Sequence, residues 1–502
     1  MSAEHLDVIV IGAGLSGVGM ACHLAQLCPG KQMAILERRH AIGGTWDLFR
    51  YPGVRSDSDM FSFGYQFRPW NDLQVLADGE SIRRYINDTA AEHGIIDKIR
   101  FGVDIIRADW STTNKLWTLT ATRLESGENC QFTCHFLISC TGYYNYHQGY
   151  LPTFPGVERF QGQCIHPQAW PQDLDYRDKK VVIIGSGATA ITLVPAMAST
   201  AAHVTMVQRS PSYIFSVPSR DALAGFMKKL MPERWVYHFT RQRNIRIQRW
   251  MYRAAKRWPN ATRRFLLKQV RKHLDNPDHM RHFTPNYMPW DQRLCAVPDS
   301  DLFHAINAGK ASVETDHIET FTEQGLLLRS GKTIEADIIV TATGLQVQVL
   351  GGMQLMIDGH PFELHDQLTY KAVMVQNLPN MGWILGYTNA SWTLKADIAA
   401  QYLCRLIKHM DQNGYQVAVP LGGEENALPS SIMGSLKSGY VGRANDVLPR
   451  QGNTMPWQVM NDYLQDAQML IKESLQDGIL TFDPPAAMAP PTAERPAELA
   501  LV

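Results

Sequence analysis

The 502-residue sequence has little cysteine, no excess of charge of either sign and no long hydrophobic run. Eight scattered cysteines are typical of reduced thiols, and the closest pair, Cys130 and Cys134, lacks the further ligands that a zinc site needs. A formal net charge of zero speaks against nucleic acid as the main partner. No apolar run is long enough to span a bilayer or to form a signal peptide. These absences favour a cytoplasmic globular protein without a metal site.

Two stretches of the chain share one pattern, in which an apolar strand runs into a glycine-rich turn and then a helix. They read VIVIGAGLSG at 8–17 and VVIIGSGATA at 181–190, and each is followed by a second apolar strand. Such a βαβ unit binds the pyrophosphate of a dinucleotide at the N-terminus of its helix. The repetition predicts an α/β protein with two Rossmann-like dinucleotide-binding domains.

The first turn has all three glycines of the dinucleotide-binding pattern. Gly12 permits the tight turn, Gly14 allows the pyrophosphate to approach the backbone, and Gly17 allows the helix to pack closely on the strand. Glu37 ends the next strand, where a carboxylate accepts hydrogen bonds from ribose hydroxyls. We predict that this turn binds FAD.

The second turn differs at positions that bear on the choice of dinucleotide. Ala190 replaces the third glycine, and the second strand ends in Gln208 and Arg209 where the first unit has Glu37. An arginine there pairs with a 2′-phosphate, which favours NADPH; the alternative is that Arg209 is only a solvated charge at a strand end. The predicted NADPH contacts are Gly185, Ser186, Gly187, Ala188, Thr189, Ala190, Gln208 and Arg209.

The order of these units predicts that the NADP domain is inserted in the FAD domain, with a helical subdomain inside the insertion. Two similar strand-and-turn pieces, FLISCTGYY and DIIVTATGL, mark where the chain leaves and re-enters the FAD domain. The predicted limits are 1–149 and 336–482 for the FAD domain, 150–221 and 291–335 for the NADP domain, 222–290 for a basic helical insertion and 483–502 for a flexible tail rich in proline and alanine.

The sequence lacks the cysteine pair through which disulfide reductases with two dinucleotide sites pass their electrons. After the first Gly-Gly-Thr the chain reads GGTWDLFRYPGVRSD at 43–57, without cysteine, and the second domain has no CxxC. The remaining electron acceptors are O2 and a quinone-like molecule.

Two longer motifs resemble those of type I Baeyer–Villiger flavin monooxygenases. FQGQCIHPQAWP at 160–171 matches FxGxxxHxxxWP, and the stretch from Gly43 to Asp57 matches GGxWxxxxYPGxxxD. Further stretches, among them CTGYYNY, PWDQRLCAVPDSDLF and GYTNASWTLKAD, are similar to the ethionamide-activating branch of that family. The resemblance covers nearly the whole chain except its C-terminal tail.

The resemblance implies an NADPH- and O2-dependent FAD monooxygenase that inserts one oxygen atom beside a ketone carbonyl, giving an ester or lactone. It implies a C4a-peroxyflavin stabilised by Arg293, with Asp57 orienting the guanidinium; the alternative for this pair is a structural ion pair. Gln292 stands where relatives have a lysine that helps to bind the 2′-phosphate, which leaves NADPH preference to Arg209. Hydrophobic ketones are the expected substrates, with sulfoxidation of thioethers or thioamides as a second activity.

Two other functions remain open at this point. A flavin monooxygenase that oxygenates nitrogen or sulfur shares both turns but does not need the cation of Arg293, because only attack on a ketone requires an anion. A non-catalytic FAD-binding escort at a membrane shares the fold, but it needs no complete second dinucleotide site.

The resemblance also implies further contacts with the cofactors. Arg55 and Ser56 are expected beside the nicotinamide, while Asn389 and Trp392 face substrate or flavin, or belong to the core. His166 could transfer a proton, but its place in a linker favours a role in domain movement. The expected FAD contacts are Gly12, Gly14, Ser16, Gly17, Glu37, Gly44, Thr45, Trp46, Asp47, Leu48, Asp57 and Ile105, with Val103 as the alternative to Ile105.

Residues 223–274 carry many lysines and arginines but a single acid, Glu233, with aromatic residues interleaved. A basic helix with aromatic side chains can lie on an anionic membrane surface. The alternative, which we favour, is a solvated basic face that attracts NADPH while its aromatic side chains pack inward. The expected location is therefore cytoplasmic, with peripheral membrane contact through 223–274 as the alternative.

Overall fold

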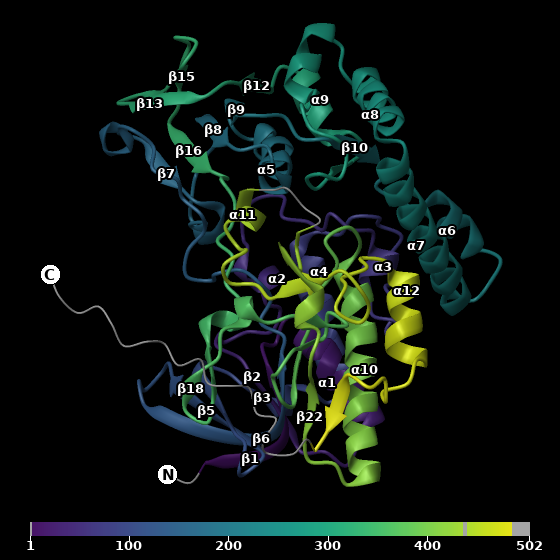
Figure 1. Cartoon of the computed structure of the whole chain (residues 1–502). Helices are drawn as coiled ribbons and strands as arrows, with labels where there is room; N and C mark the ends of the chain where they lie inside the picture. Colours follow the sequence, from purple (N-terminus) through teal and green to yellow (C-terminus); the bar gives the residue numbers. More distant parts are fainter. Residues whose placement is uncertain (1–2, 435–438, 484–502) are drawn as a thin grey trace, which may run out of the picture.

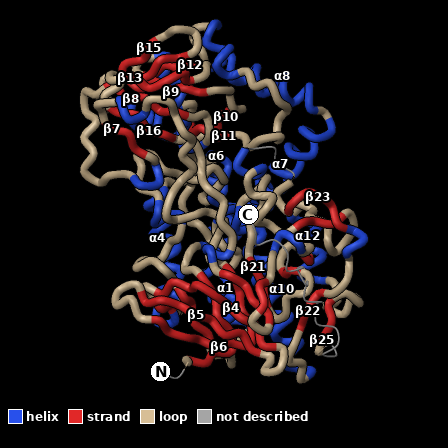
Figure 2. Tube along the Cα trace, turned by 60° about the vertical axis from the view of Figure 1, so that its left-hand side comes forward, coloured by secondary structure: helices blue, strands red, loops and turns tan. Residues whose placement is uncertain are grey.

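The computed structural model describes residues 3–434 and 439–483 (Figure 1). Apart from Asp483, the tail predicted at 483–502 lies outside these residues. Two sheets stand apart, one in the lower and one in the upper half of the molecule, with loops between them (Figure 2). The described chain is α/β with two Rossmann-like sheets, and the second is inserted in the first, as predicted.

The lower sheet has eleven strands, of which β21, β6, β1, β2 and β3 pair in parallel, whereas β4, β5 and β6 pair antiparallel. β1 pairs with β2 on one side and β6 on the other, and β6 continues in parallel pairing with β21. Its strands are β1 (Glu4–Ile11), β2 (Met33–Leu36), β3 (Ile99–Arg100), β4 (Val103–Ser111), β5 (Leu116–Arg123), β6 (Asn129–Ser139), β17 (Gln354–Ile357), β18 (His360–Pro361), β19 (Thr369–Tyr370), β20 (Met374–Val375) and β21 (Met381–Trp383).

Both faces of the lower sheet are covered, which is why the last four residues of β1, 8–11, are all apolar and buried. Val8 and Val10 pack in a core with the helices, while Leu6, Ile9 and Ile11 pack in a second core on the other face. The long helices α1 and α10 lie side by side (Figure 1). The helices of this half are α1 (Leu15–Leu27), α2 (Thr45–Leu48), α3 (Met60–Phe63), α4 (Gly79–Glu92) and α10 (Trp392–Asn413).

The upper sheet is fully parallel, in the order β12-β9-β8-β16-β7. Its strands alternate in the same way: Val181 and Ile183 face α5 and α9, whereas Val182 and Ile184 face a small antiparallel sheet. The elements are β7 (Gln163–Ile165), β8 (Lys180–Ile184), α5 (Ala188–Ala198), β9 (His203–Gln208), α9 (Asp301–Asn307), β12 (Ala311–Thr315), β16 (Ile338–Thr341) and the small sheet β13 (Ile318–Thr322), β14 (Gly325–Leu328) and β15 (Thr333–Glu335).

The remaining elements join the two halves or close the lower one. Two short strands, β10 (Ile214–Val217) and β11 (Cys295–Pro298), flank the helical stretch and pair in parallel. Towards the C-terminus, β22 pairs with β25 and β23 with β24. These elements are β22 (Ala418–Pro420), β23 (Ala427–Ser431), α11 (Gly439–Gly442), β24 (Arg450–Gly452), α12 (Tyr463–Ala467) and β25 (Leu480–Phe482).

The basic stretch forms three helices, α6 (Ala222–Met227), α7 (Glu233–Arg257) and α8 (Pro259–His273), along the right-hand edge of Figure 1. α7 is held to the lower half by Arg241, which is 4% exposed and donates from Nη1 to the carbonyl oxygens of Phe61, Ser62 and Gly64. α8 packs against β10 of the upper half. In the described part of the chain no helix has both the length and the apolar composition needed to cross a membrane.

The expectation that the aromatic side chains of this stretch pack inward is wrong for most of them. The buried side of α7 is already filled by Val236, Tyr237, Thr240, Arg241 and Ile245, so the other aromatic side chains have no core to enter. Between 48% and 66% of the surface is exposed in Trp235, Phe239, Trp250, Trp258 and Phe265.

Candidate active site

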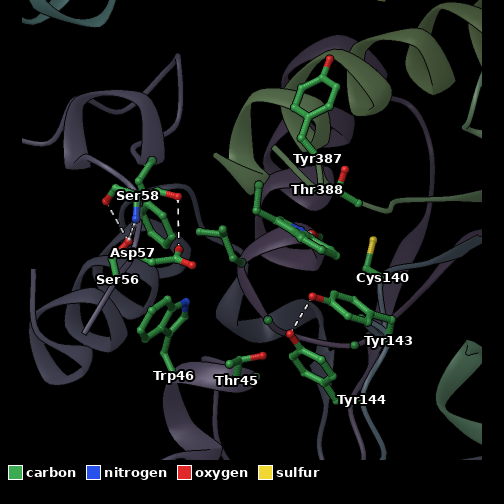
Figure 3. Close-up of a pocket in the computed structure, with 18 of the residues that line it drawn as sticks. Thr45, Trp46, Ser56, Asp57, Ser58, Cys140, Tyr143, Tyr144, Tyr387 and Thr388 are labelled. Carbon is green, nitrogen blue, oxygen red and sulfur yellow. Dashed lines mark hydrogen bonds between the residues drawn. The ribbon is translucent and has the colours of Figure 1, made fainter. Parts of the chain in front are cut away.

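A cavity of about 480 Å³ extends from the first glycine-rich turn into the space between the two halves of the molecule. Figure 3 shows part of its wall. It is walled by the first turn, the segment 43–59, the carboxyl end of β6, one face of α7 and the loop before α10. The sequence-predicted residues that line it are Gly12, Gly14, Ser16, Glu37, Gly44, Thr45, Trp46, Ser56, Asp57, Ile105 and Arg293. Ligand cavities commonly form at the carboxyl edge of parallel strands.

The first turn is packed so tightly that two of its positions exclude any side chain. A Cβ on Gly17 would lie 1.8 Å from the carbonyl oxygen of Gly12, and Gly12 itself has φ +98°, with the position of a Cβ 2.9 Å from the Cys140 oxygen. Gly14 begins α1 without any side chain that caps its free N–H groups. A helix N-terminus that is uncapped and bordered by glycine suits the pyrophosphate of a dinucleotide.

Glu37 is 6% exposed and holds this turn together from inside. Its carboxylate accepts from the backbone N–H of Ala13 at 2.6 Å and from that of Arg39 at 2.7 Å. Burial raises the pKa of Glu37, while the two backbone N–H groups oppose the shift. Each carboxylate oxygen has a second lone pair, so the group still has room to accept from a ribose hydroxyl.

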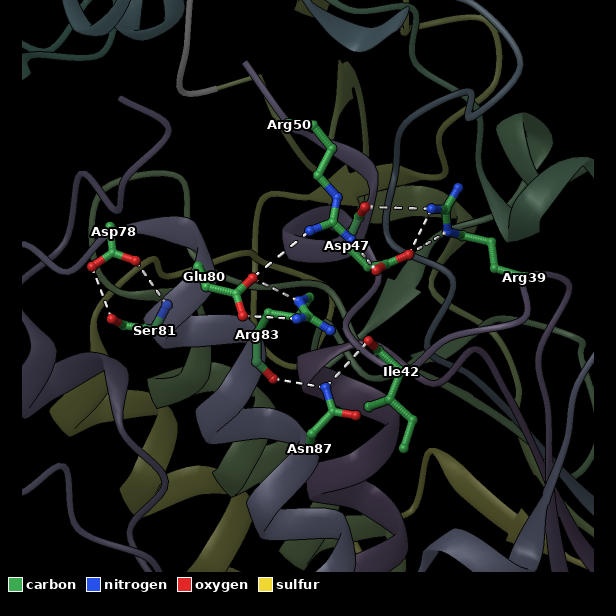
Figure 4. Close-up of polar contacts among 9 residues, drawn as sticks. All are labelled: Arg39, Ile42, Asp47, Arg50, Asp78, Glu80, Ser81, Arg83 and Asn87. Atoms are coloured by element: carbon green, nitrogen blue, oxygen red, sulfur yellow. Dashed lines mark hydrogen bonds and ion pairs between the residues drawn. The ribbon is translucent and has the colours of Figure 1, made fainter. Parts of the chain in front are cut away.

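The segment after Gly43 begins at the first turn, with Thr45 and Trp46 on the wall of the cavity. The neighbouring Asp47 does not line the cavity; its carboxylate is bound by Arg39 at 2.6 Å and by Arg50 at 2.5 Å (Figure 4). Leu48 packs instead into the core of the upper half. The two residues are therefore placed behind the cavity wall.

The same segment then reaches the upper half. A Cβ on Gly53 would lie 2.7 Å from the Cβ of Ala196 in α5, and Arg55 forms an ion pair with Asp301 at 2.6 Å. Arg55 is thus turned away from the cavity, whereas Ser56 and Asp57 line it. One continuous segment contacts the surroundings of both glycine-rich turns, which explains why its motif is long.

Arg293 and Asp57 lie far apart in the sequence but are neighbours on the wall of the cavity. Arg293 Nη1 lies 3.9 Å from Asp57 Oδ2, and Arg293 Nη2 donates to the Tyr143 hydroxyl at 3.4 Å. The side chains of Arg293 and Asp57 are 35% and 44% exposed. An ion pair of this length and exposure contributes little to stability, about 0–1 kcal/mol.

Tyr143 is the centre of an aromatic group on this wall (Figure 3). The Tyr144 hydroxyl donates to that of Tyr143 at 2.6 Å, and the Trp392 ring stacks on Tyr143 with centroids 5.4 Å apart. Trp392 Nε1 in turn donates to Ser16 Oγ at 2.7 Å. Trp392 and Asn389 both line the cavity, which for Trp392 favours the interpretation that it faces ligands.

The second glycine-rich turn lies outside this cavity. Gly187 begins α5 without a capping side chain, and nothing lies within 4 Å of the position that its Cβ would take. The Ser186 hydroxyl donates to the Ser210 oxygen. Arg209 is exposed, whereas Gln208 is 2% exposed and donates to the His282 oxygen and to Thr315 Oγ1. The open helix end fits an anionic ligand.

His166 lies in the linker after β7 and outside the cavity. Its Nδ1 accepts from the Gln168 N–H, and its Nε2 donates to the carbonyl oxygen of Gly344 in the returning linker. Burial lowers the pKa of His166, which favours the neutral ring that these two bonds require. The contact joins the two linkers between the halves.

Several cavity residues were missed at the level of sequence. Tyr143 and Tyr144 follow the carboxyl end of β6, a position that could have marked them as ligand-facing. Asn244, Gln248 and Met251 line the cavity from α7, and their i, i+4, i+7 spacing is the signal of one helix face.

A family model described as flavin-binding monooxygenase-like matches residues 5–350. The chain is 58% identical over 483 residues to the putative FAD-containing monooxygenase MymA of Mycobacterium tuberculosis, with 95% of this chain and 98% of MymA covered. It is 50% identical to the probable FAD-binding monooxygenase AlmA of Acinetobacter baylyi, with 96% of both chains covered. It is 48% identical to the FAD-containing monooxygenase EthA of M. tuberculosis, with 95% and 98% covered.

Solved structures share the fold at lower sequence identity. An oxidized steroid monooxygenase bound to NADP superposes with a TM-score of 0.75 at 20% identity, covering 93% of this chain and 97% of that one. A complex of OTEMO with FAD and NADP gives a TM-score of 0.69 at 22% identity, covering 84% and 88%. The arrangement of two Rossmann-like sheets is therefore one found in enzymes that hold two dinucleotides.

Proposed function

The chain belongs to the flavin-binding monooxygenase-like family, and we propose that it uses NADPH and O2 to insert one oxygen atom beside a ketone carbonyl. One oxygen atom enters the ester or lactone, the other leaves as water, and NADPH with a proton supplies the two electrons and becomes NADP+. The names of its relatives MymA, AlmA and EthA, which all refer to FAD, support the choice of this cofactor.

FAD fits the cavity at the first turn and NADPH fits the second turn. The uncapped α1, the Gly14 backbone and the Glu37 carboxylate would hold the FAD pyrophosphate and ribose. At the second turn α5, Gly187 and the exposed Arg209 would hold NADPH and its 2′-phosphate. When bound, the flavin supplies the chemistry that the chain lacks, namely two-electron reduction by NADPH and activation of O2.

We propose supporting roles for predicted residues that do not line the cavity. Asp47, Leu48 and Gly17 would act behind the FAD site through the backbone that they position, and Arg55 through its ion pair with Asp301. Gln208 would support the second site through its internal hydrogen bonds. We also propose the domain limits given above, with the NADP domain between 150 and 335 and its helical insertion at 222–290.

We propose that Arg293 is the catalytic cation. Arginine is a permanent cation in proteins. The guanidinium of Arg293 lies on the cavity wall, 3.9 Å from Asp57 Oδ2 and 3.4 Å from the Tyr143 hydroxyl. Attack on a ketone builds negative charge on oxygen, and a fixed cation at that place lowers the barrier by about 3–4 kcal/mol. Asp57 and Tyr143 would orient the guanidinium from two sides. This placement of Arg293 is the observation that carries the proposal.

The wall beyond Arg293 favours a hydrophobic ketone. Its apolar residues are Phe215, Val217, Ile247, Met251, Trp290 and Leu294. Burial of apolar substrate surface there contributes about 25 cal/mol per Å². Thioethers and thioamides are proposed as secondary substrates, since a sulfur atom can accept oxygen without the anion that ketones need. The second candidate, an enzyme that oxygenates only nitrogen or sulfur, would use the same cavity without Arg293.

The test compares the wild type with Arg293→Ala and Arg293→Lys, and with Arg177→Ala as a control at an exposed arginine in the linker. Each purified yellow protein is incubated with NADPH and phenylacetone, 2-octanone or methyl phenyl sulfide, and products are measured by gas chromatography. Flavin content and anaerobic reduction by NADPH are measured in parallel.

We expect ester from the wild type and the control, and a loss of about a hundredfold or more in ester formation by Arg293→Ala while flavin reduction persists. Sulfoxide without ester in the wild type would replace the proposal by heteroatom oxygenation. Ester from Arg293→Ala at the wild-type rate would remove Arg293 from the chemistry and leave the monooxygenase in place.

A further inference from the structure

The outer face of the helices α6–α8, called here the basic helical face, exposes apolar side chains that no other part of the described chain covers. On α6 and the turn after it, Leu223, Phe226 and Leu230 are 51%, 59% and 68% exposed. Their i, i+3, i+7 spacing puts them on one side, while Ala224 on the opposite side is fully buried. Three large apolar side chains in one row are more than the scattered exposure that is normal for a protein surface.

A second exposed row lies on α7, which packs beside α6. Trp235 and Phe239 are one helical turn apart, with their rings stacked at 6.0 Å, and Trp250 lies further along the same side at 66% exposure. Their alignment with Arg246 and Arg257 follows the 3.6-residue period of the helix. The face is therefore amphipathic, with aromatic side chains and cations projecting in the same direction.

The cations of this face are only partly neutralised by the protein. Arg243, Arg249 and Arg253 form ion pairs with Asp221 or Asp462. Other exposed cations have no acidic partner among residues 3–434 and 439–483, notably Arg234, Arg246, Arg257, Arg264, Lys268 and Arg271. The stretch itself contributes one acid, Glu233. Uncompensated cations next to exposed aromatic side chains call for an anionic, partly apolar partner.

The same helix that carries this face also walls the cavity. Asn244, Gln248 and Met251 face the cavity from α7. Ile247 lines the cavity and is 48% exposed, so it marks an edge where the cavity meets solvent. Trp250 is three residues further on, so the mouth of the cavity at Ile247 adjoins the exposed aromatic row.

We propose that the basic helical face docks on an anionic phospholipid membrane and that a lipophilic substrate enters the cavity from that surface past Ile247. Leu223, Phe226, Leu230, Trp235, Phe239 and Trp250 insert at the interface, and the unpaired cations lie against phosphate headgroups. A second copy of this chain is a poorer partner, because two faces with unpaired cations repel each other. Nucleic acid is a poorer partner because it would leave the aliphatic side chains in water.

Docking itself is independent of the proposed oxygen transfer; the delivery of substrate rests on it. The first experiment is therefore co-sedimentation of the full-length, FAD-loaded protein with vesicles of phosphatidylcholine alone or mixed with phosphatidylglycerol. One variant combines Phe226→Ser, Trp235→Ser and Trp250→Ser, and a second combines Arg234→Gln, Arg246→Gln and Arg257→Gln. None of these six residues lines the cavity.

Matched controls alter the same chemistry elsewhere on the surface. Ile96, Leu124 and Leu151, which are 45%, 48% and 61% exposed, are changed together to serine. Arg177, Lys180 and Arg329, which are exposed on the upper half or the linker before it, are changed together to glutamine. The sedimentation coefficient and flavin content of every protein are recorded.

We expect binding of the wild type and both controls to the mixed vesicles and little binding to phosphatidylcholine alone. Removal of the three arginines should weaken binding by about a hundredfold, at roughly fivefold per cation. Loss of the three apolar side chains should weaken it by about tenfold or more. Equal binding by variants and wild type, or no preference for anionic lipid, would overturn the proposal. So would a wild-type dimer that the apolar variant dissociates, or tighter binding to duplex DNA than to vesicles.

The delivery step is tested by the rate of NADPH-dependent ester formation from a long-chain ketone held in the vesicles and from a short, water-soluble ketone. We expect the apolar variant to lose about tenfold with the vesicle-borne ketone while it keeps the wild-type rate with the soluble one. If the apolar variant matched the wild-type rate with the vesicle-borne ketone as well as with the soluble one, delivery from the membrane would be refuted. Absence of ester from either ketone in the wild type would refute the proposed function and leave the docking result standing.

Discussion

Glu37→Gln tests how the first turn is held together, because it changes one atom of a buried carboxylate. The wild-type carboxylate accepts from two backbone N–H groups, those of Ala13 and Arg39, at 2.6 Å and 2.7 Å. A glutamine amide has only one oxygen, so one of these N–H groups must face the NH2 group instead of an acceptor. The substitution preserves volume, so packing is not a competing cause.

The expected destabilisation follows from these two bonds. A hydrogen bond to a charged acceptor contributes about 1.5–3 kcal/mol, and a buried N–H left without an acceptor costs about 1–3 kcal/mol. Burial opposes the charge of Glu37 and raises its pKa, which offsets part of the loss. We therefore expect Glu37→Gln to lower the free energy of unfolding of the lower half by about 2–3 kcal/mol.

Urea denaturation followed by circular dichroism measures this loss, and release of FAD during the titration reports the turn itself. Glu92→Gln is the matched control, because Glu92 is 55% exposed and paired with Arg68 at the surface, where such a change costs under about 1 kcal/mol. A Glu37→Gln midpoint that coincides with that of Glu92→Gln, with FAD retained, would refute the account of the turn.

Two further predictions concern the turn and the upper half. Gly17→Ala puts a Cβ 1.8 Å from the Gly12 oxygen, so it should lower the free energy of unfolding by about 3 kcal/mol or more and yield FAD-free protein. The control Gly30→Ala, whose Cβ meets nothing within 4 Å, should keep its flavin. A Gly17→Ala protein saturated with FAD would contradict this prediction. Burial lowers the pKa of His282 from 6.5 to about 4. The neutral ring therefore favours folding above pH 6.5, and this contribution is lost as the pH falls towards 4. The free energy of unfolding should fall by about 1.4 kcal/mol per pH unit over this range. In His282→Gln the free energy of unfolding should depend less steeply on pH between pH 6.5 and 4 than in the wild type. The control His360→Gln changes an exposed histidine and should keep the wild-type slope. An unchanged slope in His282→Gln would contradict the assignment of a buried neutral ring.

The elements nearest to the glycine-rich turns could be predicted because their causes are local. Each unit is encoded within about fifteen residues. It consists of an apolar strand, a glycine that the tight turn requires, and a helix that begins directly after the turn. The third position of the glycine pattern is Gly17 in the first turn and Ala190 in the second. This difference also has a local cause, because the structure accommodates a Cβ at Ala190 and has no room for one at Gly17.

The role of the helical stretch could be predicted only in part. Its charge and its helical period were visible, but which side of α7 packs against α3 depends on Arg241 reaching three carbonyl oxygens of another segment. The sequence interpretation placed the aromatic side chains inside because large apolar side chains usually find a core. Here that core was filled by other residues of the same helix.

The sequence by itself determined the two βαβ units, their order and the family to which the chain belongs, because each depends on residues that are neighbours along the chain. Only the tertiary structure decided that Arg293 lies beside Asp57 and Tyr143. It also decided that the carboxylate of Asp47 is bound by Arg39 and Arg50. One face of α7 lines the cavity while the other remains exposed, which is likewise a result of tertiary packing. These placements join residues distant in sequence. They are set by how the sheets, linkers and helices pack as a whole, which no local pattern of residues encodes.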